Sequence, residues 1–329
     1  MSHAENTEKV RAASVSVLSN TLLVAGKLSV GLLIGSVSVI SEAIHSAVDL
    51  VAAVIAWFAV RISGQPADKE HPYGHGKYEN LSGAIEALLI FVAAIWIIVE
   101  AVDKLRHGGG VHAPGWGVAV MGISALANFL VSANLMRVGR KTDSLALIAD
   151  AMHLRTDVWT SIGVLTGLVV IWIGKFAFPH LDLSWVDPVS AIAVALLIVH
   201  AAWELTMQAT HGLLDTSLPQ EDIDEIRRTA LARGDIRSLH DLKTRKAGPD
   251  RIIDAHVAVD YSLNVLEGHD KGKSFKGELL GRWPRSWVNI HVDPCDGSCR
   301  PPCLSGCLLS AELRAAEHRA WEARRAPIQ

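Results

Sequence analysis

The sequence lacks the short motifs that identify many hydrolases and ATP-driven pumps. It contains no HExxH pair, no GxSxG turn for a nucleophilic serine, and no GxxxxGKS or GxxxxGKT loop for nucleotide phosphates. It also lacks a dense basic patch. The 31 Lys and Arg residues are slightly outnumbered by 34 Asp and Glu residues, for a net charge of −3. These absences argue against peptide hydrolysis, ATP-driven pumping and nucleic-acid binding.

Long apolar blocks dominate the first two thirds of the chain. Hydrophobic residues make up 50% of the 329 residues, and the mean hydropathy is +0.28. Each block is close to the roughly 20 residues that cross the hydrocarbon core of a bilayer. We therefore predict six membrane-spanning helices, near residues 14–34, 38–62, 81–104, 114–136, 147–173 and 185–207.

Basic residues predict the orientation of these helices. The first block follows a polar run and has no small-residue cleavage site, so we interpret it as a retained span rather than a signal peptide. Basic residues are more frequent on the N-terminal side of the membrane than on the other side, which predicts that both termini are cytoplasmic. The basic residues assigned to the cytoplasmic side are Lys9, Arg11, Arg61, Lys69, Lys77, Arg137, Arg140 and Lys141, against Lys104, Arg106 and Lys175 opposite.

Two of the apolar blocks carry the same pair of ionisable residues. His45 and Asp49 are four residues apart in one block, and His153 and Asp157 repeat the spacing in another, so each pair occupies one face of a helix. Two imidazoles and two carboxylates form a shell that suits Zn²⁺ in charge and in donor type. Ionisable groups inside a bilayer are costly, which favours a metal site over polar residues that only pack helices together.

After residue 208 the long apolar blocks end, and polar and apolar residues are mixed. A helix beginning near residue 217 is followed by strands at 239–246 and 251–260, a helix at 265–280 and a strand at 287–293. The predicted fold class is an α-helical membrane protein with six transmembrane helices, followed by a cytoplasmic α+β domain of order αββαβ whose helices cover one face of the sheet. The predicted parts are an N-terminal segment 1–13, a membrane domain 14–207, the αββαβ domain 208–294 and a Cys-containing tail 295–329.

Four segments of the sequence together resemble one known family. Residues 35–49, 71–79, 150–157 and 240–249 are similar to motifs of the cation diffusion facilitators, most closely the bacterial zinc, cadmium and iron efflux branch. The resemblance extends over roughly residues 10–295. It implies a homodimeric, proton-coupled antiporter that exports divalent metal by alternating access, and it implies no enzymatic activity.

The resemblance assigns the intramembrane transport site to the two pairs already singled out. In some relatives an Asp replaces the first ligand and the metal range is broader, so His45 implies a preference for zinc, with cadmium, iron and cobalt as further substrates. Metal binds the deprotonated ligands, so protons entering from the other side release it. Asp150 is either a second layer of this site or a carboxylate at a helix end. Other polar residues predicted to line the pathway or to pair helices are Asn20, Lys27, Glu86, Asn128 and Asn134.

The resemblance also implies metal sites outside the membrane. On spacing alone, Asp68, His71 and His75 are more typical of a solvated loop, and the resemblance makes a metal site an equal alternative. His291 and Asp293 share one face of a predicted strand. His240 and His256 are expected to join them in a regulatory site, with His269 supplied by the partner subunit. Lys77 and Asp215 match a pair that links the protomers at a hinge.

All four cysteines lie in the predicted tail. Pro301 and Pro302 interrupt their CxxxC spacing, so the cysteines cannot share one continuous helix. In a reducing cytoplasm the thiols stay free and suit soft metals, although the spacing differs from the CxxC of zinc ribbons. A mobile appendage with a charged helix at 310–325 is an equal alternative. The cysteines are Cys295, Cys299, Cys303 and Cys307.

Besides an exporter, a membrane metalloenzyme and a metal sensor are two other classes of protein that place metal ligands in a membrane domain. A membrane metalloenzyme needs an open coordination position and a nearby general base, whereas four protein ligands fill the shell predicted here. A metal sensor that keeps a transporter's fold without flux is the remaining alternative. For the exporter, a bacterial inner membrane is the expected location, because the chain has no His-rich loop between the fourth and fifth spans.

Overall fold

The computed structural model describes residues 3–34, 37–107, 115–177 and 185–325. The chain divides into two compact units, Met1–Leu213 and Leu214–Gln329. The predicted boundary at residue 208 therefore lies slightly too early. The last membrane helix continues to Leu213 before the second unit begins.

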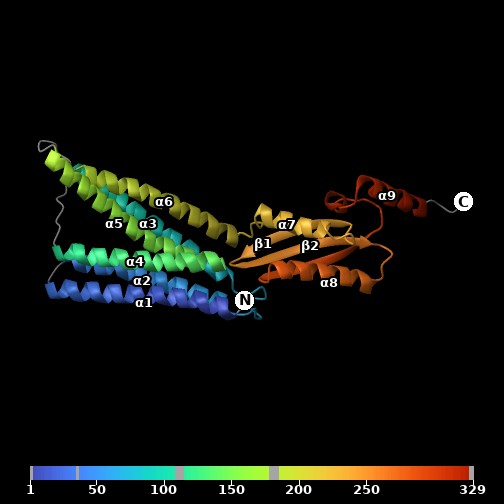
Figure 1. Ribbon diagram of the computed structural model, residues 1–329, viewed down its shortest axis with the longest axis horizontal. Coiled ribbons are helices and arrows are strands. Elements are labelled where there is room, and N and C mark those ends of the chain that lie inside the picture. The colour runs from blue at the N-terminus through green and yellow to red at the C-terminus, as the bar shows by residue number, and fades with distance from the viewer. Residues whose placement is uncertain (1–2, 35–36, 108–114, 178–184, 326–329) are drawn as a thin grey trace. The chain divides into compact units, whose positions relative to one another are not determined.

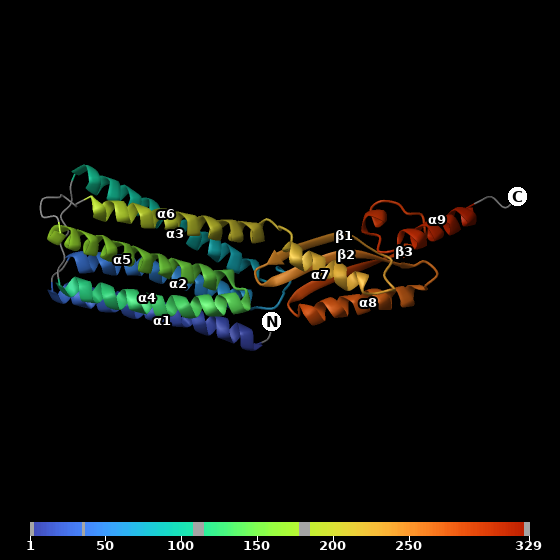
Figure 2. The ribbon, with the colours of Figure 1, turned by 45° about the horizontal axis from the view of Figure 1, so that its top comes forward.

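The first unit consists of long helices that run side by side (Figures 1 and 2). Helix α3 packs against α6, α1 against α2, and α4 against α5. The order and positions of these helices agree with the six predicted spans. Their bounds are α1 His3–Ile34, α2 Val37–Ser63, α3 Lys77–His107, α4 Gly115–Thr142, α5 Leu145–Ala177 and α6 Val186–Leu213.

Several of these helices are longer than the predicted spans. Helix α1 begins at His3, whereas the apolar block begins near residue 14. The intervening residues are rich in Ala, Glu and Lys, which favour helix, so the helix extends beyond its apolar part. Hydropathy locates the part of a helix that crosses the membrane, and helix ends follow other rules.

Length and hydropathy identify four candidate membrane spans among the described residues. In α4 and α5 the structure describes side chains only for residues 122–142 and 145–163. The other four helices contain windows long and apolar enough to cross a membrane. These windows are Ala4–Leu33, Ala43–Ser63, Lys77–Arg106 and Pro188–Leu213.

Small residues form much of the core of the helical unit. One cluster contains Ala59, Ala146 and Ala151, and many large apolar side chains are instead exposed, as Leu33 and Trp96 are. This distribution is typical of a membrane bundle, in which small residues let helices approach and large ones face lipid.

The second unit has the predicted order αββαβ. The sheet order is β1-β2-β3, with β1 and β2 antiparallel and β2 and β3 parallel. Each strand agrees with its predicted range to within two residues. The elements are α7 Gln220–Leu231, β1 Ser238–Ala247, β2 Asp250–Asp260, α8 Val265–Arg282 and β3 Ser286–Cys295.

Both helices of this domain cover the same face of the sheet, as predicted. Ile226 of α7 and Phe275 of α8 join Ile253, Ala255 and Val257 of β2 in one buried cluster. Because side chains alternate along a strand, the residues between these β2 positions face the other way. The face of the sheet opposite to the helices is therefore available for polar residues.

The tail contains the short helix η1 Cys303–Gly306 and the predicted charged helix, α9 Ala311–Arg325. It packs against β1, the edge strand of the sheet. Ser238 of β1 pairs with Cys307, and the N–H of Leu308 donates to the carbonyl oxygen of Arg237 at 2.9 Å. The tail thereby covers a strand edge that would otherwise expose unpaired backbone groups.

Candidate metal centres

Helices α2 and α5 bring the doubled His and Asp pairs into one cluster. The Nε2 atom of His153 lies 3.2 Å from Oδ1 of Asp49, and Nε2 of His45 lies 3.8 Å from Oδ1 of Asp157. Each imidazole thus meets the carboxylate of the other helix. Ligand atoms of His45, Asp49 and Asp157 all lie within 4.8 Å of one another, close enough to share one ion.

The four side chains of this site differ in exposure. Those of Asp49 and His153 are 4% and 7% exposed, whereas those of Asp157 and His45 are 22% and 57% exposed. The cluster is therefore buried at Asp49 and His153 and exposed at His45 within this chain.

Two further residues support the intramembrane site. The side-chain amide of Asn128, on α4, donates to Oδ2 of Asp157 at 3.2 Å, so one of the predicted pathway residues contacts the cluster directly. Asp150 is fully buried one turn before His153, and its carboxylate oxygens make no hydrogen bond to any residue that the structure describes. Of the two predicted roles for Asp150, its burial favours the second layer over an exposed helix end.

The loop before α3 forms a second cluster. Oxygens of Asp68 lie 3.5 Å from Nδ1 of His71 and 3.4 Å from Nε2 of His75. The backbone N–H of His71 donates to Asp68 at 2.6 Å, and this hydrogen bond holds the pKa of the Asp68 carboxyl below its ordinary value. The loop therefore offers an ionised oxygen and two imidazoles, and the predicted residues do come together.

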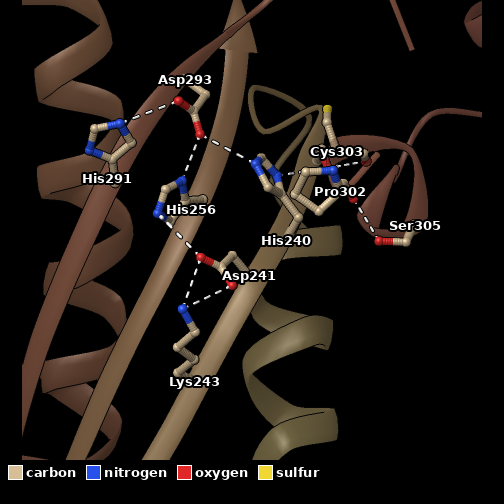
Figure 3. A network of polar contacts seen from close by, with 10 residues as sticks. His240, Asp241, Lys243, His256, His291, Asp293, Pro302, Cys303 and Ser305 are labelled. Carbon is tan, nitrogen blue, oxygen red and sulfur yellow. Dashed lines mark hydrogen bonds and ion pairs between the residues drawn. The ribbon is translucent and has the colours of Figure 1, made fainter. Parts of the chain in front are cut away.

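The third cluster lies on the sheet face opposite to α7 and α8. The strand register places His240, His256 and His291 side by side on three strands, and Asp293 reaches all three rings (Figure 3). Its oxygens lie 3.3 Å from Nε2 of His240, 2.9 Å from Nδ1 of His256 and 3.3 Å from Nε2 of His291. Four residues that are distant in sequence thereby form one polar centre.

Asp241 is a member of this centre that the sequence analysis missed. Its Oδ2 lies 3.8 Å from Nε2 of His256 (Figure 3). Simple alternation would turn Asp241 away from His240, but the strand register shifts between His240 and Lys243, and Asp241 has a positive φ of 47°. This bulge turns its carboxylate toward the histidines. Sequence periodicity gives no signal for such a bulge.

His269 does not join the centre within one chain. It is exposed on α8, the helix that covers the other face of the sheet. The same-chain part of the predicted ligand set is thus complete without it. A contribution of His269 from a second protomer remains a prediction.

Comparison with known proteins agrees with this architecture. The profile described as "Cation efflux transmembrane domain" matches residues 13–214, and "Cation efflux protein, cytoplasmic domain" matches residues 218–295. The chain belongs to the cation efflux family. This family corresponds to the cation diffusion facilitators, so the predicted resemblance is confirmed.

Named relatives cover most of the cation efflux chain. An uncharacterised transporter of Synechocystis sp. is 34% identical over 82% of this chain and 85% of its own. The cation-efflux pump FieF of Cronobacter sakazakii is 32% identical over 90% and 96%, and that of Citrobacter koseri is 31% identical over 87% and 92%. A solved chain from a study of CzrB is 34% identical, with a TM-score of 0.23, and covers 24% of this chain and 98% of its own.

The relatives also decide between two of the predicted classes. They are named as cation-efflux transporters and not as enzymes. The prediction that this cation efflux protein is not an enzyme is therefore confirmed, and the metalloenzyme alternative is set aside.

The predicted hinge pair stays a prediction. The ammonium group of Lys77 donates to the carbonyl oxygen of Leu213 at 3.3 Å within the first unit. Asp215 belongs to the second unit, where its carboxylate oxygens lie 3.0 and 3.1 Å from the guanidinium of Arg245. Each residue has a partner inside its own unit of the cation efflux protein.

Proposed function

We propose that this protein exports divalent metal cations from the cytoplasm in exchange for protons, with zinc as its main substrate. The observation that supports the proposal is the crossed arrangement of two imidazoles and two carboxylates between α2 and α5. Two carboxylates cancel the charge of a divalent ion, and a mixed nitrogen and oxygen shell favours zinc over manganese or magnesium. Cadmium, iron and cobalt are the further substrates of this donor set.

Exchange for protons follows from the chemistry of the same ligands. Zinc binds imidazole and carboxylate only in their deprotonated forms, so metal and protons compete for one set of atoms. An imidazole in water has a pKa near 6.5, so small changes in surroundings or pH change its protonation. A metal site that opens alternately to each side of the membrane then couples the export of metal to the import of protons.

The clusters outside the membrane are proposed to regulate transport. The loop cluster at Asp68 and the sheet cluster at Asp293 both present several potential metal ligands and share no residue with the cluster between α2 and α5. We place both termini in the cytoplasm of a bacterium, with the chain in the inner membrane as a homodimer. Metal binding to the sheet cluster would then report the cytoplasmic zinc level to the membrane part.

Reconstituted vesicles test the proposal. Purified wild-type protein and the Asp157→Ala variant are inserted into vesicles that contain a zinc indicator, and a pH gradient is imposed. We expect zinc flux that follows the gradient in wild type and disappears in Asp157→Ala. Glu100→Ala is the matched control, because Glu100 is an exposed carboxylate on α3 that pairs with Lys104 at 3.0 Å. This control should transport as wild type does.

Two outcomes would contradict different parts of the proposal. Zinc flux that ignores the pH gradient would exclude proton exchange and leave metal transport intact. Absence of flux in the wild-type protein, with zinc still bound in solution, would exclude transport and support the sensor alternative.

A further inference from the structure

The tail beyond residue 295 is a folded extension of the cytoplasmic domain. The matched family profile ends at residue 295, so this segment lies outside the part shared with that profile. Arg237 of the domain binds Glu317 of α9 at 2.8 Å, and Arg324 of α9 lies over the ring of Tyr261 at 4.4 Å. These contacts attach α9 to the end of the sheet and hold the chain between them in place.

The four cysteines converge in this held segment. They come from the end of β3, the following turn, the start of η1 and the residue after η1. All four are free thiols, and all four line one cavity of about 130 Å³. The cavity is bounded by the tail itself and by Arg237 of the domain. The cysteines are Cys295, Cys299, Cys303 and Cys307.

We propose that these four cysteines bind one thiophilic divalent cation of the zinc and cadmium class in a tetrathiolate shell. Four thiolates are a common structural ligand set for zinc, and the soft sulfur donors favour cadmium and zinc over hard cations. The site is separate from the three histidine and carboxylate clusters. It adds a metal centre that the proposed transport mechanism does not require.

The surroundings of the cavity suit such a shell. A divalent ion held by four thiolates carries a net charge of about −2. Arg237, Arg300 and Arg314 line the same cavity together with Asp296 and Glu317, so the charged residues of the lining carry a small net positive charge that offsets part of this negative charge. The tail would also become better ordered, because a metal that joins four separated positions restricts their motion.

Binding has to draw the thiols together. With zinc to sulfur bonds of about 2.3 Å, the sulfurs of a tetrahedral shell lie about 3.8 Å apart. The described residues with three ligand atoms within 4.8 Å of one another belong to the other clusters and not to the tail. Closing the shell therefore moves the segment from Cys295 to Cys307, which is the segment that contacts β1.

This segment is connected through one side chain to His240, a proposed ligand of the sheet centre. The hydroxyl of Ser238 donates to the carbonyl oxygen of Cys303 at 2.8 Å and lies 3.3 Å from Nδ1 of His240. The Nε2 atom of His240 faces Asp293 in the sheet centre. Groups that hold the far nitrogen of a metal-binding histidine set its orientation. Metal in the cysteine site would thus change the affinity of the histidine site for metal, and the reverse.

Metal binding to the full-length protein in detergent tests the proposal. We expect cadmium to produce an ultraviolet thiolate-to-metal charge-transfer band in wild type and to bind with one equivalent more than in the variant with all four cysteines changed to Ser. The Asp254→Ala variant is the control, because Asp254 belongs to none of the metal clusters found among the described residues, and it should keep the band. Equal stoichiometry and no band in wild type would overturn the proposal.

Thiol protection in the wild-type protein tests the same point without relying on the folding of a variant. At a free zinc concentration about ten times the dissociation constant, alkylation of the thiols should slow about tenfold relative to metal-free protein. An alkylation rate that zinc leaves unchanged would overturn the proposal. Because neither assay measures flux, a protein that transports zinc yet shows neither signal would contradict the cysteine site alone.

Discussion

A single amide on α4 illustrates how the transport site is held in position. Asn128 donates to one oxygen of Asp157, leaving the other oxygen directed toward His45. Loss of this support should let the carboxylate rotate away from the ion. For Asn128→Ala we expect zinc affinity in the vesicle assay to fall about 10–100-fold, the usual effect of removing a group that orients a ligand.

Asn134 provides the matched control for this variant. It lies on the same helix and is half-buried, and among the described residues no metal cluster includes it. Asn134→Ala should therefore keep the affinity of wild type. Equal affinities for Asn128→Ala and wild type would show that Asp157 is oriented by other contacts.

Asn128 also shows what the sequence can and cannot predict about this site. The spacing of His45, Asp49, His153 and Asp157 was sufficient to predict that each pair shares one face of its helix, because helix geometry converts a four-residue spacing into a shared face. Their role as metal ligands stays a prediction. No comparable rule connects Asn128 to Asp157, which is 29 residues away on another helix. The contact between Asn128 and Asp157 depends on the packing of α4 against α5, which the sequence alone does not predict.

The helices of the first unit meet in a buried network at one end of the bundle. Lys9 of α1 forms an ion pair with Glu79 of α3, and both side chains are fully buried. Ser63, at the end of α2, donates to the same carboxylate at 2.5 Å, and Ser144, just before α5, also donates to it. Four helices are thus joined through one glutamate.

Lys9 is one of the basic residues that predict the orientation of the first span, and its side chain is fully buried. Hydropathy alone cannot identify a buried ion pair, because the partner, Glu79, is 70 residues away. The strands of the second unit were predicted more accurately, because alternation is a local signal and both faces of the sheet are distinct.

Removing one partner of this network should destabilise the bundle more than removing both. Lys9→Met leaves Glu79 buried without a counter-charge, a change that costs about 3–5 kcal/mol in comparable buried pairs. Glu79→Gln in the same chain removes that charge and should recover part of the loss. We therefore expect the thermal unfolding temperature in detergent to be lowest for Lys9→Met and higher for the double variant. An equal unfolding temperature for the two would show that the ion pair does not determine this stability.

Across the whole molecule, the ligands belong to two separate units. The transport cluster and the loop cluster lie in residues 1–213, and the sheet cluster lies in residues 214–329. The side chains that come together agree with the predicted groups, and their role as metal ligands stays a prediction. Residue type and the family resemblance did not predict that the carboxylate of Asp241 enters the sheet cluster through a bulge, while His269 stays on the helix that covers the opposite face.

Because the clusters lie in two separate units, we expect a mutation in one cluster to remove its own metal and to leave metal binding at the other clusters intact. Asp293 contacts His240, His256 and His291, so Asp293→Ala should abolish metal binding at the sheet cluster. Because the transport ligands are untouched, flux at saturating zinc should stay close to wild type, while its dependence on cytoplasmic zinc should change. Asp254→Ala is the control, since Asp254 lies on β2 two residues before His256 and belongs to none of the metal clusters found among the described residues.

The decisive measurement compares Asp293→Ala with Asp157→Ala in vesicles and in solution. Each variant alone should lose the metal of one cluster, and the losses should add in the double variant, because distant independent sites behave additively. Only Asp157→Ala should abolish flux. If Asp293→Ala also abolished flux at saturating zinc, the sheet cluster would be required for the transport cycle itself and could not be described as a regulator of it.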